Sequence, residues 1–203
     1  MAVVTISRQY GAGGHRLARA VAEALSFRLA DRELVDAAAG RLGIDPDLAK
    51  GRDERVPALV EELGLALAAG TPELGATPAL DDRALAEATA GVIESLADAG
   101  RYVILGRGGQ AILSGRSDAC HLALVGEEAD RVKRVMQWQG LDERDAREQC
   151  RRMDAERAAY VRRFHGADIA DPLLYDCVLN TSRLSLDRAA DVAEAAARRK
   201  LAL

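Results

Sequence analysis

The chain has 203 residues, of which 49% are hydrophobic and 30% charged, and its formal net charge at pH 7 is −4. A chain of this length buries a sizeable core, and this composition excludes a wholly disordered or collagen-like protein. The negative net charge argues against a general binder of nucleic acids or of membrane surfaces. We expect a single domain over residues 1–203, with neither nucleic acid nor a membrane as a partner.

The compartment is predicted from the cysteines and the apolar runs. Cys120, Cys150 and Cys177 are odd in number and form no C-x-x-C pair, so they match neither a disulfide framework nor a zinc site. The apolar start of the chain is too short for a signal peptide, and no apolar run approaches the roughly 18 residues that a membrane helix needs. We therefore expect a cytoplasmic protein.

The first thirty residues predict a strand, a glycine loop, a helix and a second strand. A β-branched run at 3–6 precedes a polar, glycine-rich cluster at 7–14. Apolar residues then recur at helical spacing, namely Leu17, Ala18, Val21, Ala22 and Leu25. A second short strand is expected at 27–30 and ends at Asp31.

Helices and strands alternate through the rest of the chain. Helices are expected at 31–42, 57–69, 81–99, 127–139, 142–164 and 185–201. Continuous apolar runs predict strands at 102–105, 120–125 and 176–180. Such runs are typical of a parallel sheet that is covered on both faces. The predicted fold class is therefore α/β, with a five-stranded parallel sheet between two layers of helices.

The candidate chemistry falls on one edge of this sheet. Ligands of open parallel sheets bind at the carboxyl ends of the strands. The segments that follow the strands are polar or glycine-rich: 7–16, 31–32, 106–109 and 181–183. Only three of the 28 basic residues are lysines, so arginine has to supply positive charge there. A guanidinium binds phosphate through a planar fork of donors.

The loop after the first strand has the composition of an anion site. Its glycines can adopt backbone angles that turn successive N–H groups inward, and the following helix adds the partial positive charge of its N-terminus. Arg8 before the glycines adds positive charge. The residues expected to bind phosphate are Gly11, Ala12, Gly13, Gly14, His15 and Arg16.

This loop departs from the P-loop rule G-x-x-x-x-G-K-[ST]. Arg8 stands at the first glycine, Gly14 at the lysine, and His15 at the hydroxyl residue that would hold magnesium. A plain glycine turn between strand and helix stays open as an alternative. A dinucleotide-binding turn fits less well, because Arg16 stands at its third glycine and the loop is wide.

Five segments carry a family resemblance. They are V-T-I-S-R-Q-Y-G-A-G-G at 4–14, A-D-R-E-L at 30–34, G-R-G at 106–108, D-A-E-R-A-A-Y at 154–160 and D-P-L-L-Y-D-C-V-L-N-T-S at 171–182. Together they resemble the cytidylate kinase-like family, a divergent branch of the P-loop nucleoside monophosphate kinases. The resemblance covers most of the chain and is weakest at about 43–78. It implies a monophosphate-binding insertion at about 31–99 and a mobile, arginine-rich lid at about 141–170.

The resemblance also implies roles on the acceptor side. Asp31 and Arg32 would begin the acceptor-nucleotide region, and Arg107 would contact the acceptor phosphate. From the residues alone, Asp31 fits a helix cap equally well. Arg107 stands between glycines at a strand end, where a functional role is the better interpretation.

The lid would carry catalytic arginines. By the resemblance, Arg157, with Arg162 or Arg163, would close on the transferring phosphoryl group. From composition alone, such a run fits a solvated helix face as well. Because the loop has no lysine, Arg8 is the expected cation on the β- and γ-phosphates.

The resemblance implies ATP and Mg²⁺ as cofactors and a nucleoside monophosphate as the acceptor, with CMP expected first. Phosphoryl transfer asks a protein mainly for positioning and charge neutralisation, which arginines supply. Two other functions stay open: a nucleotide-binding regulatory module without turnover, and a kinase of another small molecule on the same fold. The sequence predicts neither the magnesium ligands nor the oligomeric state.

Overall fold

The computed structural model describes residues 1–31, 37, 40 and 82–203. Arg32 and the helix expected at 57–69 lie outside the described residues, as does most of the helix expected at 31–42. The expected acceptor insertion is therefore described only at its two ends.

Five parallel strands form the centre of the fold, in the order β2-β3-β1-β4-β5. They are β1 (Val3–Arg8), β2 (Arg28–Ala30), β3 (Tyr102–Leu105), β4 (Ala119–Val125) and β5 (Cys177–Asn180). This arrangement confirms the predicted α/β class. Because β1 pairs with both β3 and β4, its carboxyl end is flanked by the ends of both neighbours.

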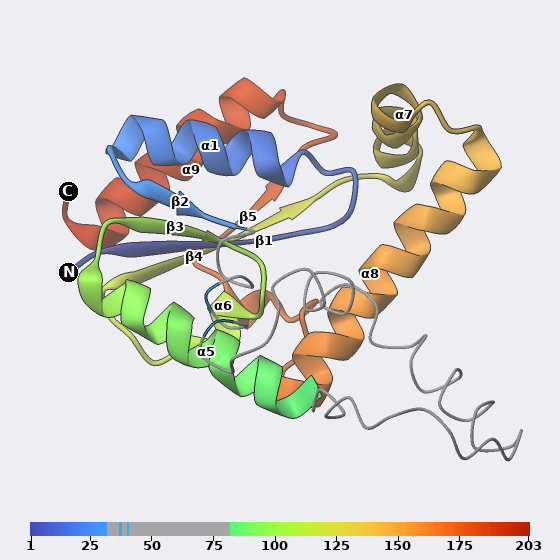
Figure 1. Ribbon diagram of the computed structural model, residues 1–203. Helices are drawn as coiled ribbons and strands as arrows, with labels where there is room; N and C mark the ends of the chain where they lie inside the picture. The colour runs from blue at the N-terminus through green and yellow to red at the C-terminus, as the bar shows by residue number, and fades with distance from the viewer. Residues whose placement is uncertain (32–36, 38–39, 41–81) are drawn as a thin grey trace, which may run out of the picture.

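Helices cover both faces of the sheet (Figure 1). One face carries α1 (Gly14–Leu25) and α9 (Leu186–Leu201), and the other carries α5 (Asp82–Ala99) and the short α6 (Gly109–Ile112). Beyond the carboxyl ends of the strands stand α7 (Glu128–Gln139) and α8 (Glu143–His165). A 3-10 turn, η1 (Pro172–Leu174), precedes β5.

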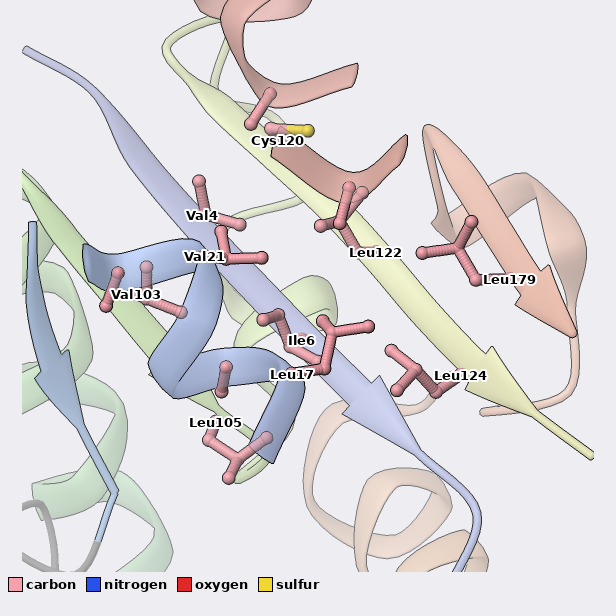
Figure 2. Packing of buried hydrophobic residues seen from close by; sticks show 14 of the residues in the cluster. Val4, Ile6, Leu17, Val21, Val103, Leu105, Cys120, Leu122, Leu124 and Leu179 are labelled. Atoms are coloured by element: carbon pink, nitrogen blue, oxygen red, sulfur yellow. The ribbon is translucent and has the colours of Figure 1, made fainter. Parts of the chain in front are cut away.

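The core explains why the strands read as continuous apolar runs. Val4 and Ile6 of β1 pack against Leu17 and Val21 of α1 (Figure 2). Val3 faces the opposite layer, in a cluster with residues of α5. Both faces of β1 are therefore buried, and each fully buried aliphatic side chain contributes about 1.5–3 kcal/mol to folding.

Two of the long helices, α8 and α9, begin where expected and carry a polar side-chain cap. Asp142 accepts a hydrogen bond from the Asp145 amide at 2.8 Å, and Ser185 caps α9 by accepting from the Arg188 amide at 3.3 Å. The short α6 and η1 were not predicted, since four and three residues are too few to show a helical period.

A polar pair is buried inside the sheet. The hydroxyl of Thr5 on β1 lies 2.8 Å from Nδ1 of His121 on β4, and the His121 amide donates to Asp176 at 2.8 Å. Burial is the main cause that lowers the pKa of His121, so this side chain is uncharged in the folded protein near neutral pH.

We expect the stability of the protein to fall in mild acid because of this histidine. Below its ordinary pKa of about 6.5, His121 takes up a proton in the unfolded chain that the folded chain does not bind. The free energy of unfolding should therefore decrease as the pH falls, by at most about 1.4 kcal/mol per pH unit for one such group. Urea denaturation of the wild type and of His121→Gln between pH 7.5 and 5 measures this slope, which should be shallower in the variant.

The matched control is His15→Gln, because the His15 side chain is 58% exposed. His165, whose pKa burial also lowers, contributes to the slope of both variants and of the wild type. An unchanged slope in His121→Gln would contradict the assignment.

Candidate functional site

A pocket opens at the carboxyl edge of the sheet, between the ends of β1 and β3 and the inner side of α8. The sheet side is lined by Ser7, Arg8, Gly106, Arg107, Gly108 and Gln110. The other side is lined by Met153, Glu156, Arg157, Tyr160, Val161 and Ile169. The lining thus contains three guanidinium groups and one carboxylate, a balance that favours an anionic ligand.

Two glycines make room for the Arg8 side chain. A Cβ atom on Gly14 would lie 2.6 Å from Cγ of Arg8, and one on Gly106 would collide with its Nη1 atom. Gly14 is the first residue of α1, whereas Gly106 lines the pocket. We call this arrangement the glycine slot (Gly14 and Gly106). It holds Arg8 between the start of α1 and the pocket.

The glycine loop leads into a helix start that suits an anion. Gly11 and Gly13 have φ angles of +77° and +86°, which side chains other than glycine rarely adopt. The first turn of α1 has no side-chain cap and no acidic residue. Helical N–H groups that lack a cap bind anions well, because the helix dipole adds partial positive charge there.

Two arginines of α7 hold the outer side of this loop. Arg131 donates to the carbonyl of Tyr10 at 2.9 Å, and Arg134 donates to the carbonyl of Gly11 at 3.2 Å. The loop also packs closely here, since a Cβ atom on Gly11 would lie 2.6 Å from the carbonyl oxygen of Arg131. These hydrogen bonds fix two carbonyl groups of the loop and so restrict its backbone.

Helix α8 is fastened to the same loop through Asp154. One carboxylate oxygen of Asp154 accepts from the Tyr10 amide at 2.7 Å, and the other pairs with Arg131 at 2.7 Å. The Arg131 side chain is only 9% exposed. A paired charge at this depth keeps a defined geometry, so the pair fixes the position of α8 against the loop.

Arg157 lies one helical turn after Asp154, on the same face of α8. Its Nη1 atom donates to the carbonyl of Arg8 at 3.2 Å, and its guanidinium lies 5.4 Å from the ring centre of Tyr10. Arg8 and Arg157, both of which the sequence analysis singled out, therefore lie beside each other at the pocket.

Arg107 lines the pocket from a segment whose backbone has positive φ angles. Gly106, Arg107 and Gly108 have φ angles of +80°, +57° and +72° in succession. A side-chain-bearing residue in this region costs about 1 kcal/mol or more, and such strain concentrates at functional sites. Gly108 is also closely packed, because a Cβ atom there would lie 2.5 Å from the His165 ring.

Other predicted residues lie away from the pocket lining. Arg16 forms an exposed ion pair with Asp187 at 2.7 Å. Asp31, at the end of β2, lies 3.2 Å from Nδ1 of His15. Arg162 is exposed on α8, and Arg163 lies 3.8 Å from Asp82. The structure therefore brings together Arg8, Arg107 and Arg157 at the pocket. The other predicted side chains do not line it, namely His15, Arg16, Asp31, Arg162 and Arg163.

Sequence reasoning did not single out the residues that support the loop. Arg131 and Arg134 are three residues apart on α7, and Asp154 and Arg157 three apart on α8. That spacing places each pair on one helix face, so a signal was present. What the spacing could not show is that both faces turn toward the glycine loop.

The described residues contain no group of three His, Cys, Asp or Glu side chains that could hold a metal ion. Among the described helices, none combines the length and the apolar character that crossing a membrane requires.

The comparison with known proteins settles the family. The model of the cytidylate kinase-like family matches residues 3–183. The chain belongs to the cytidylate kinase-like family. This confirms the resemblance drawn from the sequence. A search of curated proteins finds no match.

Solved structures show the same fold at low sequence identity. An uncharacterized protein from Eubacterium ventriosum ATCC 27560 has a TM-score of 0.68 and 24% identity, and the match covers 94% of each chain. A shikimate kinase from Bacteroides thetaiotaomicron has a TM-score of 0.54 and 14% identity, over 100% of this chain and 99% of that one. A gluconokinase from Sinorhizobium meliloti 1021 has a TM-score of 0.53 and 14% identity, over 98% and 92%. The fold of this family member is that of P-loop kinases.

Proposed function

We propose that this member of the cytidylate kinase-like family transfers the terminal phosphoryl group of ATP to a nucleoside monophosphate, with CMP as the first acceptor. The family and the fold support a kinase of a nucleotide or another small molecule. The observation that carries the proposal is the place of Arg8, which extends from the start of α1 to a cationic pocket.

The proposed donor site is the glycine loop with the first turn of α1, residues 11–16. Backbone N–H groups at the helix start would bind the β- and γ-phosphates of ATP. Arg8 would then supply the positive charge that a P-loop lysine supplies elsewhere. Arg16 and His15 would contribute less charge, since each is paired with an acidic side chain.

The proposed acceptor site is the pocket, where Arg107 would bind the acceptor phosphate. An oxygen of that phosphate attacks the γ-phosphorus of ATP, the bond from γ-phosphorus to the bridging oxygen breaks, and ADP leaves. Arg8 and Arg157 flank the path between the two sites and would neutralise the charge of the transferring group. Asp31 and Arg32 remain proposed acceptor residues.

Mg²⁺ would enter with ATP. Magnesium in kinases is commonly held by substrate phosphates, water and one or two carboxylates, and not by a cage of protein ligands. Its chemistry here would be to reduce the negative charge of the phosphates. The carboxylate of Asp31, beside the first turn of α1, is the described group that we propose to contact it through water.

A lid at about 141–170 is also part of the proposal. The first half of α8 packs on α7, where Ala146 and Cys150 join Val132 and Val135 in a small apolar cluster. The second half carries Arg157, Arg162 and Arg163. We propose that movement of this half brings the two exposed arginines toward the phosphates when substrates bind.

Two other outcomes remain distinct from this proposal. A small-molecule kinase is favoured by the fold shared with a gluconokinase and a shikimate kinase. A regulatory module without turnover is favoured by the loop that lacks the P-loop lysine and hydroxyl residues. The proposed location is the cytoplasm.

The function is tested by ADP release from ATP and Mg²⁺ with a panel of CMP, UMP, AMP, GMP, shikimate and gluconate. We expect turnover with a pyrimidine monophosphate at least tenfold above the rate without acceptor. Turnover with only a hydroxy acid would establish a small-molecule kinase instead. Tight ATP binding with no turnover on any acceptor would support the regulatory module.

We expect Arg8→Ala to lower kcat by roughly a hundredfold to a thousandfold, the usual effect of removing one preorganised charge from a transition state. The KM for ATP should change much less, because the loop amides still bind the phosphates. Arg8→Lys should restore only part of the rate, since an ammonium lacks the planar fork of donors. Normal turnover in Arg8→Ala would contradict the assignment.

A second variant disturbs Arg8 without removing it. In Gly14→Ala the new methyl group would lie 2.6 Å from Cγ of Arg8, so the side chain has to leave its position. We expect kcat to fall at least tenfold in this variant. Gly115→Ala is the matched control, because a Cβ atom there meets nothing within 4 Å.

A further inference from the structure

Gln110 is a buried amide at the floor of the pocket. It lies on α6, directly after the strained Gly106–Gly108 segment, and only 1% of its surface is exposed. Its Nε2 atom is buried and makes no hydrogen bond of standard geometry with a described residue, although the Tyr175 hydroxyl lies near the side chain. Leaving such a donor without a partner costs about 1–3 kcal/mol, so a buried unpaired amide calls for an explanation.

Three buried side-chain atoms of this kind occur in the described residues, on Gln110, His121 and His165. Only Gln110 belongs to the pocket lining. His121 lies within the sheet beside Thr5, and the His165 ring packs against Gly108 and Tyr160. The position of Gln110 therefore distinguishes it, because it is the one of these three residues that borders the pocket.

Two hydroxyl groups lie near Gln110, that of Ser7 in the pocket lining and that of Tyr175 next to it. Ser7 lines the same pocket at the end of β1. The Tyr175 hydroxyl donates to the carbonyl of Ile169 at 2.8 Å, which leaves its oxygen as an acceptor. Burial raises the pKa of Tyr175, while Ser7 and Gln110 lie close enough to its oxygen to lower it in part. These groups are uncharged near neutral pH, in contrast to the arginines of the rim.

We propose that Gln110 determines acceptor specificity by donating a hydrogen bond from its side-chain amide to an uncharged oxygen of the phosphoryl acceptor, a carbonyl or a hydroxyl. This inference rests on the proposed function, since it requires that the pocket is the acceptor site. The arginines bind the anionic end of the acceptor, and Gln110 selects the neutral polar end. A ligand oxygen at this point satisfies the amide that the described residues leave unpaired.

The different roles of Gln110 and of the arginines follow from the chemistry of their side chains. A carboxamide cannot neutralise a phosphate, but a site that is built to hydrogen-bond an oxygen discriminates strongly against analogues that lack it. Gln110 is thus a specificity residue, separate from the charged groups that we assign to phosphoryl transfer.

Gln110→Met tests the proposal, because methionine keeps the length of the side chain and removes the amide. With the monophosphate that the wild type uses best, the KM for the acceptor should rise roughly tenfold to a hundredfold, and the KM for ATP should stay within about twofold. The melting temperature without ligands should stay the same or rise by a few degrees, since an unpaired buried donor is gone. Gln137→Met is the matched control, because Gln137 is exposed on α7, and it should behave as the wild type.

Gln110→Glu tests whether the amide hydrogen bond or the shape of the side chain matters. It keeps the side-chain outline but loses the NH₂ group, so its acceptor KM should rise as in Gln110→Met. If the acceptor KM is unchanged in both variants, the inference about Gln110 is wrong. The proposed function still stands in that case, provided that the wild type phosphorylates a monophosphate. A melting temperature that falls by several degrees in both, with acceptor and ATP parameters worsening together, also overturns it and makes Gln110 a structural residue. A wild type that turns over no monophosphate overturns both proposals.

Discussion

The Arg8 side chain fits only because two residues beside it have no side chain. One of them, Gly14, begins the helix that the phosphates of a nucleotide would meet, and the other, Gly106, borders the pocket. A single arginine thereby connects the proposed donor site to the proposed acceptor site. The remaining features of this edge of the sheet keep that arginine and the loop around it in one arrangement.

The loop is held from the outside by charge. Arg131 and Arg134 bind its carbonyl groups, and Asp154 binds both its Tyr10 amide and Arg131. Buried polar groups need such partners, and a loop that gains them from two helices loses much of its freedom. The same contacts set Arg157 beside Arg8, so the support of the loop and the placement of a second cation depend on one turn of α8.

The sequence predicted the fold well where the physical signal is local. Continuous apolar runs marked strands buried on both faces, and the helical spacing of apolar residues such as Leu17 and Val21 marked the first helix. Strand ends and glycines identify the edge of a parallel sheet, so the sequence also singled out Arg8 and Arg107, while the family resemblance singled out Arg157. The structure places these three side chains at one pocket, and their roles are proposals. Gln110 was not found, since its role depends on an unpaired amide that only the packing of α6 under the pocket reveals. Likewise, nothing in the sequence showed that Arg16 would pair with Asp187, 171 residues later.

The central claim is that Arg8 replaces the loop lysine at the phosphates. A crystal structure with Mg²⁺ and a non-hydrolysable ATP analogue tests it most directly. The account predicts the β-phosphate at the first N–H groups of α1, and an Arg8 guanidinium nitrogen within about 3.2 Å of a β- or γ-phosphate oxygen. Phosphates bound away from the start of α1, or an Arg8 side chain that contacts no phosphate oxygen, would contradict it.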